Sequence, residues 1–171
     1  MSKTIRAIYT VFLGMLIALF VGVGIDAFYE GPKYPEYPFE LKEYPNEKDK
    51  NYAQELKKYN QAQAEYDRKI KKYESENKEY SRNVSILSLA ASVIILISAL
   101  TFANKMYLIS DGLLLGGLFA LIYSLIRGFE ADSSMFRFMV VSVGLILSII
   151  IGYIKLIKSD LKLKIKNPID F

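Results

Sequence analysis

The chain of 171 residues is 52% hydrophobic and 23% charged, carries a formal net charge of +4, and has neither cysteine nor histidine. The absence of these two residue types excludes disulfides, thiol catalysis, Ser-His-Asp and Cys-His catalytic groups, and metal sites built on imidazole. The sequence therefore predicts no catalytic, cofactor-binding or metal-binding residues, and we expect a protein that is not an enzyme.

Four apolar runs, at about 7–25, 84–103, 108–126 and 138–154, dominate the chain. Each is close to the ~20 residues that a helix needs to cross a bilayer. Buried core helices are the alternative, but so short a chain leaves too little soluble protein to cover four of them. A signal peptide is a second alternative for the first run, which is longer than the ~7–15 apolar residues typical of one. We expect four transmembrane helices.

These runs divide the chain into an N-terminal tail with the first span (1–28), a long loop (29–83), three further spans within 84–157 (about 84–103, 108–127 and 137–155) and a basic tail (158–171). Lysines are concentrated in that tail, and Lys3 and Arg6 precede the first span. We expect a protein of the plasma membrane, in which the positive-inside rule places both termini in the cytoplasm and 29–83 outside.

A period of three residues marks the start of the long loop. Polyproline II has three residues per turn, so a residue at every third position lies on one edge of it. That edge is apolar from end to end, with Pro32, Pro35, Pro38, Leu41 and Tyr44. Tyr34, Tyr37 and Phe39 lie off this edge, and we expect them to be exposed contact residues.

A period of seven residues follows. It consists of tyrosines, each followed four positions later by a second seam residue, the pattern of a coiled-coil seam. The tyrosines are Tyr52, Tyr59, Tyr66, Tyr73 and Tyr80, and the second set is Leu56, Gln63, Ile70, Asn77 and Val84. No Gly or Pro interrupts this stretch, and Asn46 is a favourable N-cap. We expect one helix from about Asn46 to Ala103, continuous with the second span.

The two periods predict a hairpin. At ~3.1 Å per residue, a polyproline II segment over 29–45 reaches about 50 Å, and a helix over 46–82 at ~1.5 Å per residue reaches about 55 Å. Prolines three apart that face tyrosines seven apart resemble the hairpin of the pancreatic polypeptide group. The resemblance covers about 29–84 and implies a packing motif only. The alternatives are a coiled coil between neighbouring copies, which can coexist with the hairpin, and a disordered Lys/Glu-rich loop.

Small residues recur every four positions in the spans, a pattern that lets helix backbones approach closely in lipid. They are Gly14, Ala18 and Gly22 in the first span, Gly112, Gly116, Ala120, Ser124 and Gly128 in the third, and Gly144, Ser148 and Gly152 in the fourth. Ser88 and Ser92 are the counterparts in the second span. The stripes predict a compact four-helix bundle within one chain, and the alternative is an interface with another subunit.

Asp111 is the one ionisable residue that falls within a predicted span. It is a candidate ion or proton site, because charged residues in spans mark such pathways. The alternative is a carboxylate near the cytoplasmic end of a helix, where the positive N-terminus of the helix favours negative charge. The alternating tail at 161–166 is either a basic strand on anionic lipid or a topology signal.

The fold class expected is therefore an all-α integral membrane protein with an extracytoplasmic hairpin stalk. We expect a non-catalytic accessory, scaffold or interaction subunit that contacts membrane lipid and either a protein partner or further copies of itself. The alternatives are a channel or transporter component with Asp111 as its functional carboxylate and, with least support, an intramembrane enzyme. The lysines have no accompanying nucleic-acid-binding motif, so we expect no nucleic acid partner.

Overall fold

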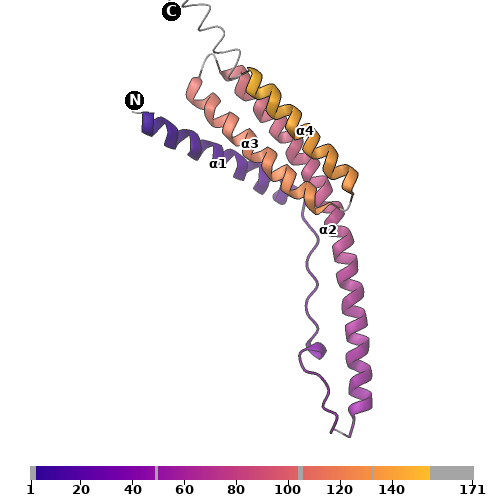
Figure 1. Ribbon diagram of the computed structural model, residues 1–171. Helices are drawn as coiled ribbons and strands as arrows, with labels where there is room; N and C mark the ends of the chain where they lie inside the picture. The colour runs from indigo at the N-terminus through magenta and orange to yellow at the C-terminus, as the bar shows by residue number, and fades with distance from the viewer. Residues whose placement is uncertain (1–2, 49, 104–105, 132, 155–171) are drawn as a thin grey trace, which may run out of the picture. The chain divides into compact units, whose positions relative to one another are not determined.

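The computed structural model describes residues 3–48, 50–103, 106–131 and 133–154, and this part of the chain is helical without strands (Figure 1). The α-helices are α1 (Lys3–Phe28), α2 (Tyr52–Phe102), α3 (Tyr107–Glu130) and α4 (Ser134–Gly152), and a short 3-10 helix, η1, spans Phe39–Leu41. The alternating tail at 161–166 lies outside the described residues. The contacts divide the described residues into a bundle unit (those within 3–30 and 81–154) and a hairpin unit (those within 31–80).

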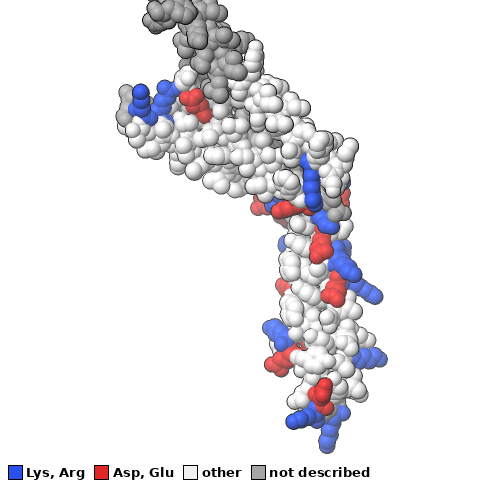
Figure 2. Space-filling model, in the orientation of Figure 1, with Lys and Arg blue, Asp and Glu red and all other residues white. Residues whose placement is uncertain are grey.

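All four α-helices are long and apolar enough to cross a membrane. The prediction of an all-helical chain with four such helices is confirmed. α2 has 51 residues, of which only the C-terminal part is apolar, because its first half carries the charged and tyrosine-containing sequence. Figure 2 shows the same division, since Lys, Arg, Asp and Glu are dense on the hairpin unit and sparse on the visible surface of the bundle helices.

The helix bounds differ from the predicted ones, most of all at the start of α2. α2 begins at Tyr52, not near Asn46, because the side-chain oxygen of Asn46 accepts a hydrogen bond from the backbone nitrogen of Lys48 (3.1 Å). This Asx turn satisfies the local backbone without starting a helix. The first helical hydrogen bond instead runs from the backbone nitrogen of Glu55 to the carbonyl of Asn51 (3.1 Å).

α4 begins three residues before the predicted span because Ser133 caps it. The Ser133 hydroxyl accepts a hydrogen bond from the backbone nitrogen of Phe136 (3.3 Å), as an N-cap side chain does. Arg137 donates two hydrogen bonds from its guanidinium to the carbonyl of Ala131 (2.9 and 2.8 Å) and so ties α4 to the link that precedes it.

The bundle unit packs around α3. α1 lies against α3 in parallel, since Leu13 meets Gly112 and Ile17 meets Gly116. On another side of α3, buried leucines from α2 and α3 join the last turn of α4, with Leu96, Leu121 and Ile151 at the centre of the cluster. α3 is thus the helix that the others share, and its eight buried residues are mostly Gly, Ala and Ser.

In the hairpin unit, an extended segment runs beside the first half of α2, and η1 lies partway along this segment (Figure 1). Leu41 in η1 is buried, and its carbonyl accepts a hydrogen bond from the Tyr37 hydroxyl (3.1 Å). The prolines at 32, 35 and 38 are half-buried, whereas the charged side chains between them are exposed.

Candidate functional site

The described residues contain no cluster of acidic side chains that could hold a metal ion. Their polar chemistry in the bundle unit is instead concentrated toward the two ends of α3 and along one face of α2. In the hairpin unit it is a row of paired tyrosines. These groups include Asp111 and the seam tyrosines among the candidate site residues that the sequence predicts.

Asp111 forms an ion pair with Arg6. Arg6 Nη2 lies 3.1 Å from Asp111 Oδ2, and the Arg6 guanidinium lies 4.5 Å from the centre of the Tyr107 ring. The ion pair joins the first turns of α1 to the start of α3. Cation–π contacts of this kind favour Arg. The side chain predicted as a possible ion site is therefore placed as one half of a contact between two helices.

At the other end of α3, Glu130 accepts hydrogen bonds from two elements. The Ser81 hydroxyl on α2 donates to Glu130 Oε2 over 2.7 Å, and Arg127 on α3 donates to the same oxygen over 2.9 Å. Arg127 also donates to the Tyr123 hydroxyl over 3.3 Å. Hydrogen bonds to charged groups are among the stronger ones in proteins, so this cluster fixes α2 to α3 at that end.

Between these ends, α2 and α3 exchange hydrogen bonds through serines. The Ser85 hydroxyl donates to the Ser124 carbonyl (2.9 Å), and the Ser124 hydroxyl donates to the Ser85 carbonyl (2.8 Å). The Ser110 hydroxyl donates to the Ala99 carbonyl (2.8 Å). All three serines are fully buried. Close approach of the two backbones makes these bonds possible, as is usual where small polar residues face each other in apolar helices.

Sequence reasoning missed half of the serine face on α2. It predicts Ser88 and Ser92 as small packing residues but not Ser81 and Ser85, although all four are fully buried. Their spacing of four, three and four residues is helical and is visible in the sequence. Ser88 and Ser92 donate to carbonyls of their own helix, at Val84 and Leu89. The helical spacing of all four serines is therefore the signal that could have found the face.

The predicted glycine stripes separate into two groups. A methyl group added at Gly14, Gly112 or Gly116 would come within 3.0 Å or less of a side chain of the facing helix, and one at Gly144 within 3.4 Å of Leu121. At Gly22 and Gly152, nothing lies within 4 Å. Of the other members, Ala120 is buried, Ala18 is half-buried, and Ser148 donates a hydrogen bond to the Gly144 carbonyl (2.9 Å).

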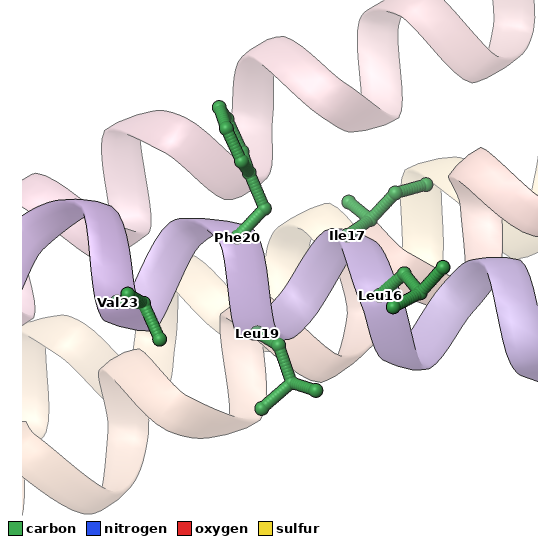
Figure 3. Close-up of a pocket in the computed structure, with 5 residues that line it drawn as sticks. All are labelled: Leu16, Ile17, Leu19, Phe20 and Val23. Carbon is green, nitrogen blue, oxygen red and sulfur yellow. The ribbon is translucent and has the colours of Figure 1, made fainter.

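α1 also carries a shallow apolar groove of about 520 Å³. Figure 3 shows its five lining side chains, all on α1: Leu16, Ile17, Leu19, Phe20 and Val23. Ile17 packs at Gly116, whereas Leu19 and Phe20 are exposed. The lining side chains are all apolar and come from one helix, so the groove has no polar group that could orient a ligand. It therefore lacks the features of a specific binding site.

In the hairpin unit, tyrosines of the extended segment meet tyrosines of α2 edge to face. The ring centres lie 5.1 Å apart for Tyr34 and Tyr73 and 5.3 Å apart for Tyr37 and Tyr66. Those of Tyr44 and Tyr59 lie 5.2 Å apart. Such separations and angles are favourable for aromatic pairs.

The remaining seam residues lie along the same face of α2. Tyr80 is buried, and a methyl group at Gly31 would lie 3.1 Å from its ring. Leu56, Ile70 and Tyr52 are half-buried. Tyr52 is hydrogen-bonded to Tyr44, which raises the pKa of Tyr52 above its ordinary value, with burial as a smaller cause.

Four aromatic side chains of the extended segment and η1 remain largely exposed, and we call them the aromatic ridge. Their exposed fractions are 65% for Tyr34, 56% for Tyr37, 76% for Phe39 and 64% for Tyr44. Beside the ridge, a pocket of about 540 Å³ includes Phe39, Tyr44 and Tyr59 together with Glu and Lys side chains.

Neither a known protein family, a curated protein nor a solved structure matches the chain. Its function is therefore inferred from the groups described above.

Proposed function

We propose that this chain is a four-span protein of the plasma membrane that acts as a non-catalytic accessory or scaffold subunit and binds a protein partner through its hairpin unit. In this proposal both termini are cytoplasmic and 29–83 is outside. The aromatic ridge is the observation on which the proposal depends. Tyr and other aromatic side chains are enriched in protein interfaces and in the few residues that contribute most of the binding energy.

We further infer that the extended segment is a polyproline II arm, so that the hairpin unit acts as a stalk. Pro38 supports this inference with φ −61° and ψ 140°, close to the ~−75° and ~+145° of polyproline II. A polyproline II arm loses little conformational freedom on binding, because its prolines already restrict the chain. The same property makes it suited to present side chains to a partner.

The absence of cysteine from the chain gives a clean test of the topology. Single cysteines at Asn60 in the hairpin unit and at Ser2 in the N-terminal tail would be labelled in intact cells with a membrane-impermeant maleimide. We expect labelling at position 60 and, only after lysis, at position 2. Labelling of both positions, or only of position 2, in intact cells would contradict the proposed orientation.

Photo-crosslinking tests the partner. A photoreactive amino acid at Phe39 should give a discrete adduct in cells, whereas one at Arg68, which is also exposed but lies off the ridge, should not. Phe39→Ala should then weaken capture of that partner by about tenfold or more, as truncation of an interface anchor does, and Arg68→Ala should leave it unchanged. Equal adducts at both positions, or no effect of Phe39→Ala, would count against the proposal. An adduct with a second copy of the chain would identify the partner as the protein itself.

The arrangement around Asp111 favours this proposal over a transport function. A carboxylate near the start of α3 that is paired with Arg6, near the start of α1, has the features of a structural anchor. Transport sites are expected near mid-membrane, at broken helices. Ion flux in liposomes that is abolished by Asp111→Asn would favour the channel hypothesis instead.

A further inference from the structure

A second groove in the bundle unit lies between α1 and α3 and has a volume of about 470 Å³. Its lining is graded from charged to apolar. Lys3, Arg6 and Asp111 lie toward one end, and Val11, Leu114 and Leu115 follow along the helices. Leu13 faces Gly112 and Ile17 faces Gly116, so α1 and α3 run in the same direction. This parallel arrangement produces the gradient. Both helices therefore begin at the same end of the groove.

We propose that this groove binds an anionic phospholipid, with the phosphate at Lys3 and Arg6 and the upper part of an acyl chain over Val11, Leu114 and Leu115. The proposal depends on the membrane insertion of the chain, but not on the partner of the hairpin unit. Basic pockets between transmembrane helices bind the headgroups of anionic lipids in this way, and the volume is within the usual range of ~300–1,000 Å³ for ligand sites.

The charges of the groove suit one phosphate. Lys3 and Arg6 are cationic and Asp111, which is paired with Arg6, is anionic, so the side chains that line the groove carry one positive charge in excess. Arg6 is anchored by a single hydrogen bond to Asp111 and by the Tyr107 ring, and its side chain is 44% exposed. A guanidinium has five N–H donors, so Arg6 can donate to a phosphate oxygen while it stays paired.

The apolar side of the groove selects the lipid rather than a soluble phosphate. Val11 and the two leucines offer no hydrogen-bond donor to an ion, but an acyl chain can cover them. In the proposed orientation, the charged end lies at the cytoplasmic surface, where anionic lipids are found and where each nearby Lys or Arg contributes to attraction.

The test uses the full chain in a neutral detergent and measures lipid retention by native mass spectrometry. We expect one phosphatidylglycerol to be retained several-fold more than phosphatidylcholine. Lys3→Gln should reduce this retention about fivefold, the value of one surface lysine against anionic lipid. Lys71→Gln, which makes the same change on the hairpin unit, should have no effect. Equal retention of the two lipids, or equal effects of the two variants, would overturn the proposal.

A second variant separates the lipid from free phosphate. Ala7 lines the groove, so Ala7→Phe should fill it and reduce phosphatidylglycerol retention while the charges stay in place. Glycerol 3-phosphate, which has the headgroup chemistry but no acyl chain, should compete only at concentrations far above that of the lipid. Competition at lipid-like concentrations would show a soluble-anion site and overturn the assignment. Lys3→Gln should not affect crosslinking from Phe39. If the lipid proposal fails, the partner proposal therefore still stands or falls by its own test.

Discussion

Tyr34 meets Tyr73 edge to face, with ring centres 5.1 Å apart and planes at 73°. The next pair along the chain is Tyr37 with Tyr66. A step of three residues on the extended segment therefore matches a step of seven on the helix. These steps cover nearly equal lengths, about 9.3 Å at ~3.1 Å per extended residue and about 10.5 Å at ~1.5 Å per helical residue. The near match keeps these two pairs of rings in register, whereas the next pair, Tyr44 with Tyr59, lies seven positions further on along both segments.

A double-mutant cycle should detect the contact between Tyr34 and Tyr73. We expect their replacement by alanine to show a coupling free energy of about 0.5–1.5 kcal/mol, the range for edge-to-face aromatic pairs. The measurement is the free energy of opening of the α2 amides in the hairpin unit, from hydrogen exchange of the purified chain. The matched control is Tyr34 with Tyr59, whose ring instead contacts Tyr44. Coupling of the same size in the control cycle would argue against a specific ring contact.

Alkaline pH should weaken the same unit. Tyr66 lies outside the apolar part of α2. The pKa of Tyr66 is raised above its ordinary value of about 10, mainly by the hydrogen bond with Tyr34 and to a smaller extent by burial. The folded state thus favours the neutral phenol. This contribution to stability is complete below pH about 10 and is lost as pH rises through the folded-state pKa.

The titration of Tyr66 can be followed by carbon NMR of its labelled ring. In Tyr34→Phe, which removes the first cause of the shift, the midpoint should move to lower pH. After correction for the intrinsic pH dependence of exchange, the protection of the amides in the hairpin unit of the wild-type protein should fall as pH rises through the Tyr66 midpoint. A Tyr66 that titrates at the same pH with and without the Tyr34 hydroxyl would contradict the assignment.

Two glycine substitutions should have clearly different effects on the bundle unit. At Gly116, a methyl group would lie 2.7 Å from Ile17 Cβ and 3.2 Å from the Gly14 carbonyl oxygen, and neither atom can move aside easily. Gly116→Ala should therefore destabilise the protein by about 1–3 kcal/mol through overpacking. Gly22→Ala meets nothing within 4 Å and should be neutral or slightly stabilising, because Ala is the better helix former. Unfolding in mixed micelles measures both, and equal effects would show that α1 does not pack on α3 in this way.

The reciprocal serine pair should contribute to the stability of the bundle unit. Ser85→Ala removes a donor to the Ser124 carbonyl, and we expect a loss of about 0.6 kcal/mol and at most about 1.7 kcal/mol, as for hydrogen bonds between other membrane helices. Ser98→Ala is the control, because the Ser98 hydroxyl donates only within its own helix, to Ile94 (2.8 Å). The same unfolding assay compares them. If Ser98→Ala lowered the free energy of unfolding as much as Ser85→Ala, the reciprocal serine pair would make no specific contribution to stability.

Much of the architecture follows from the sequence alone, because it depends on local properties. The length and hydropathy of each apolar run are sufficient to predict a helix that could span a bilayer, and the described residues have four. The two periods, three and seven, are likewise visible in the sequence alone, and each is the spacing that one backbone conformation predicts. The absence of cysteine and histidine excludes their chemistry without any structure.

Only the tertiary structure decided which of the predicted features meet. Gly14 and Gly116 face a neighbouring helix while Gly22 does not, although the three belong to the same kind of stripe. Arg6 and Asp111, 105 positions apart, become an ion pair because α1 and α3 are parallel neighbours. The start of α2 at Tyr52 also escaped prediction, because the Asn46 turn competes with helix formation. A repeat marks one face of an element, but its partner depends on the packing of elements distant in the chain.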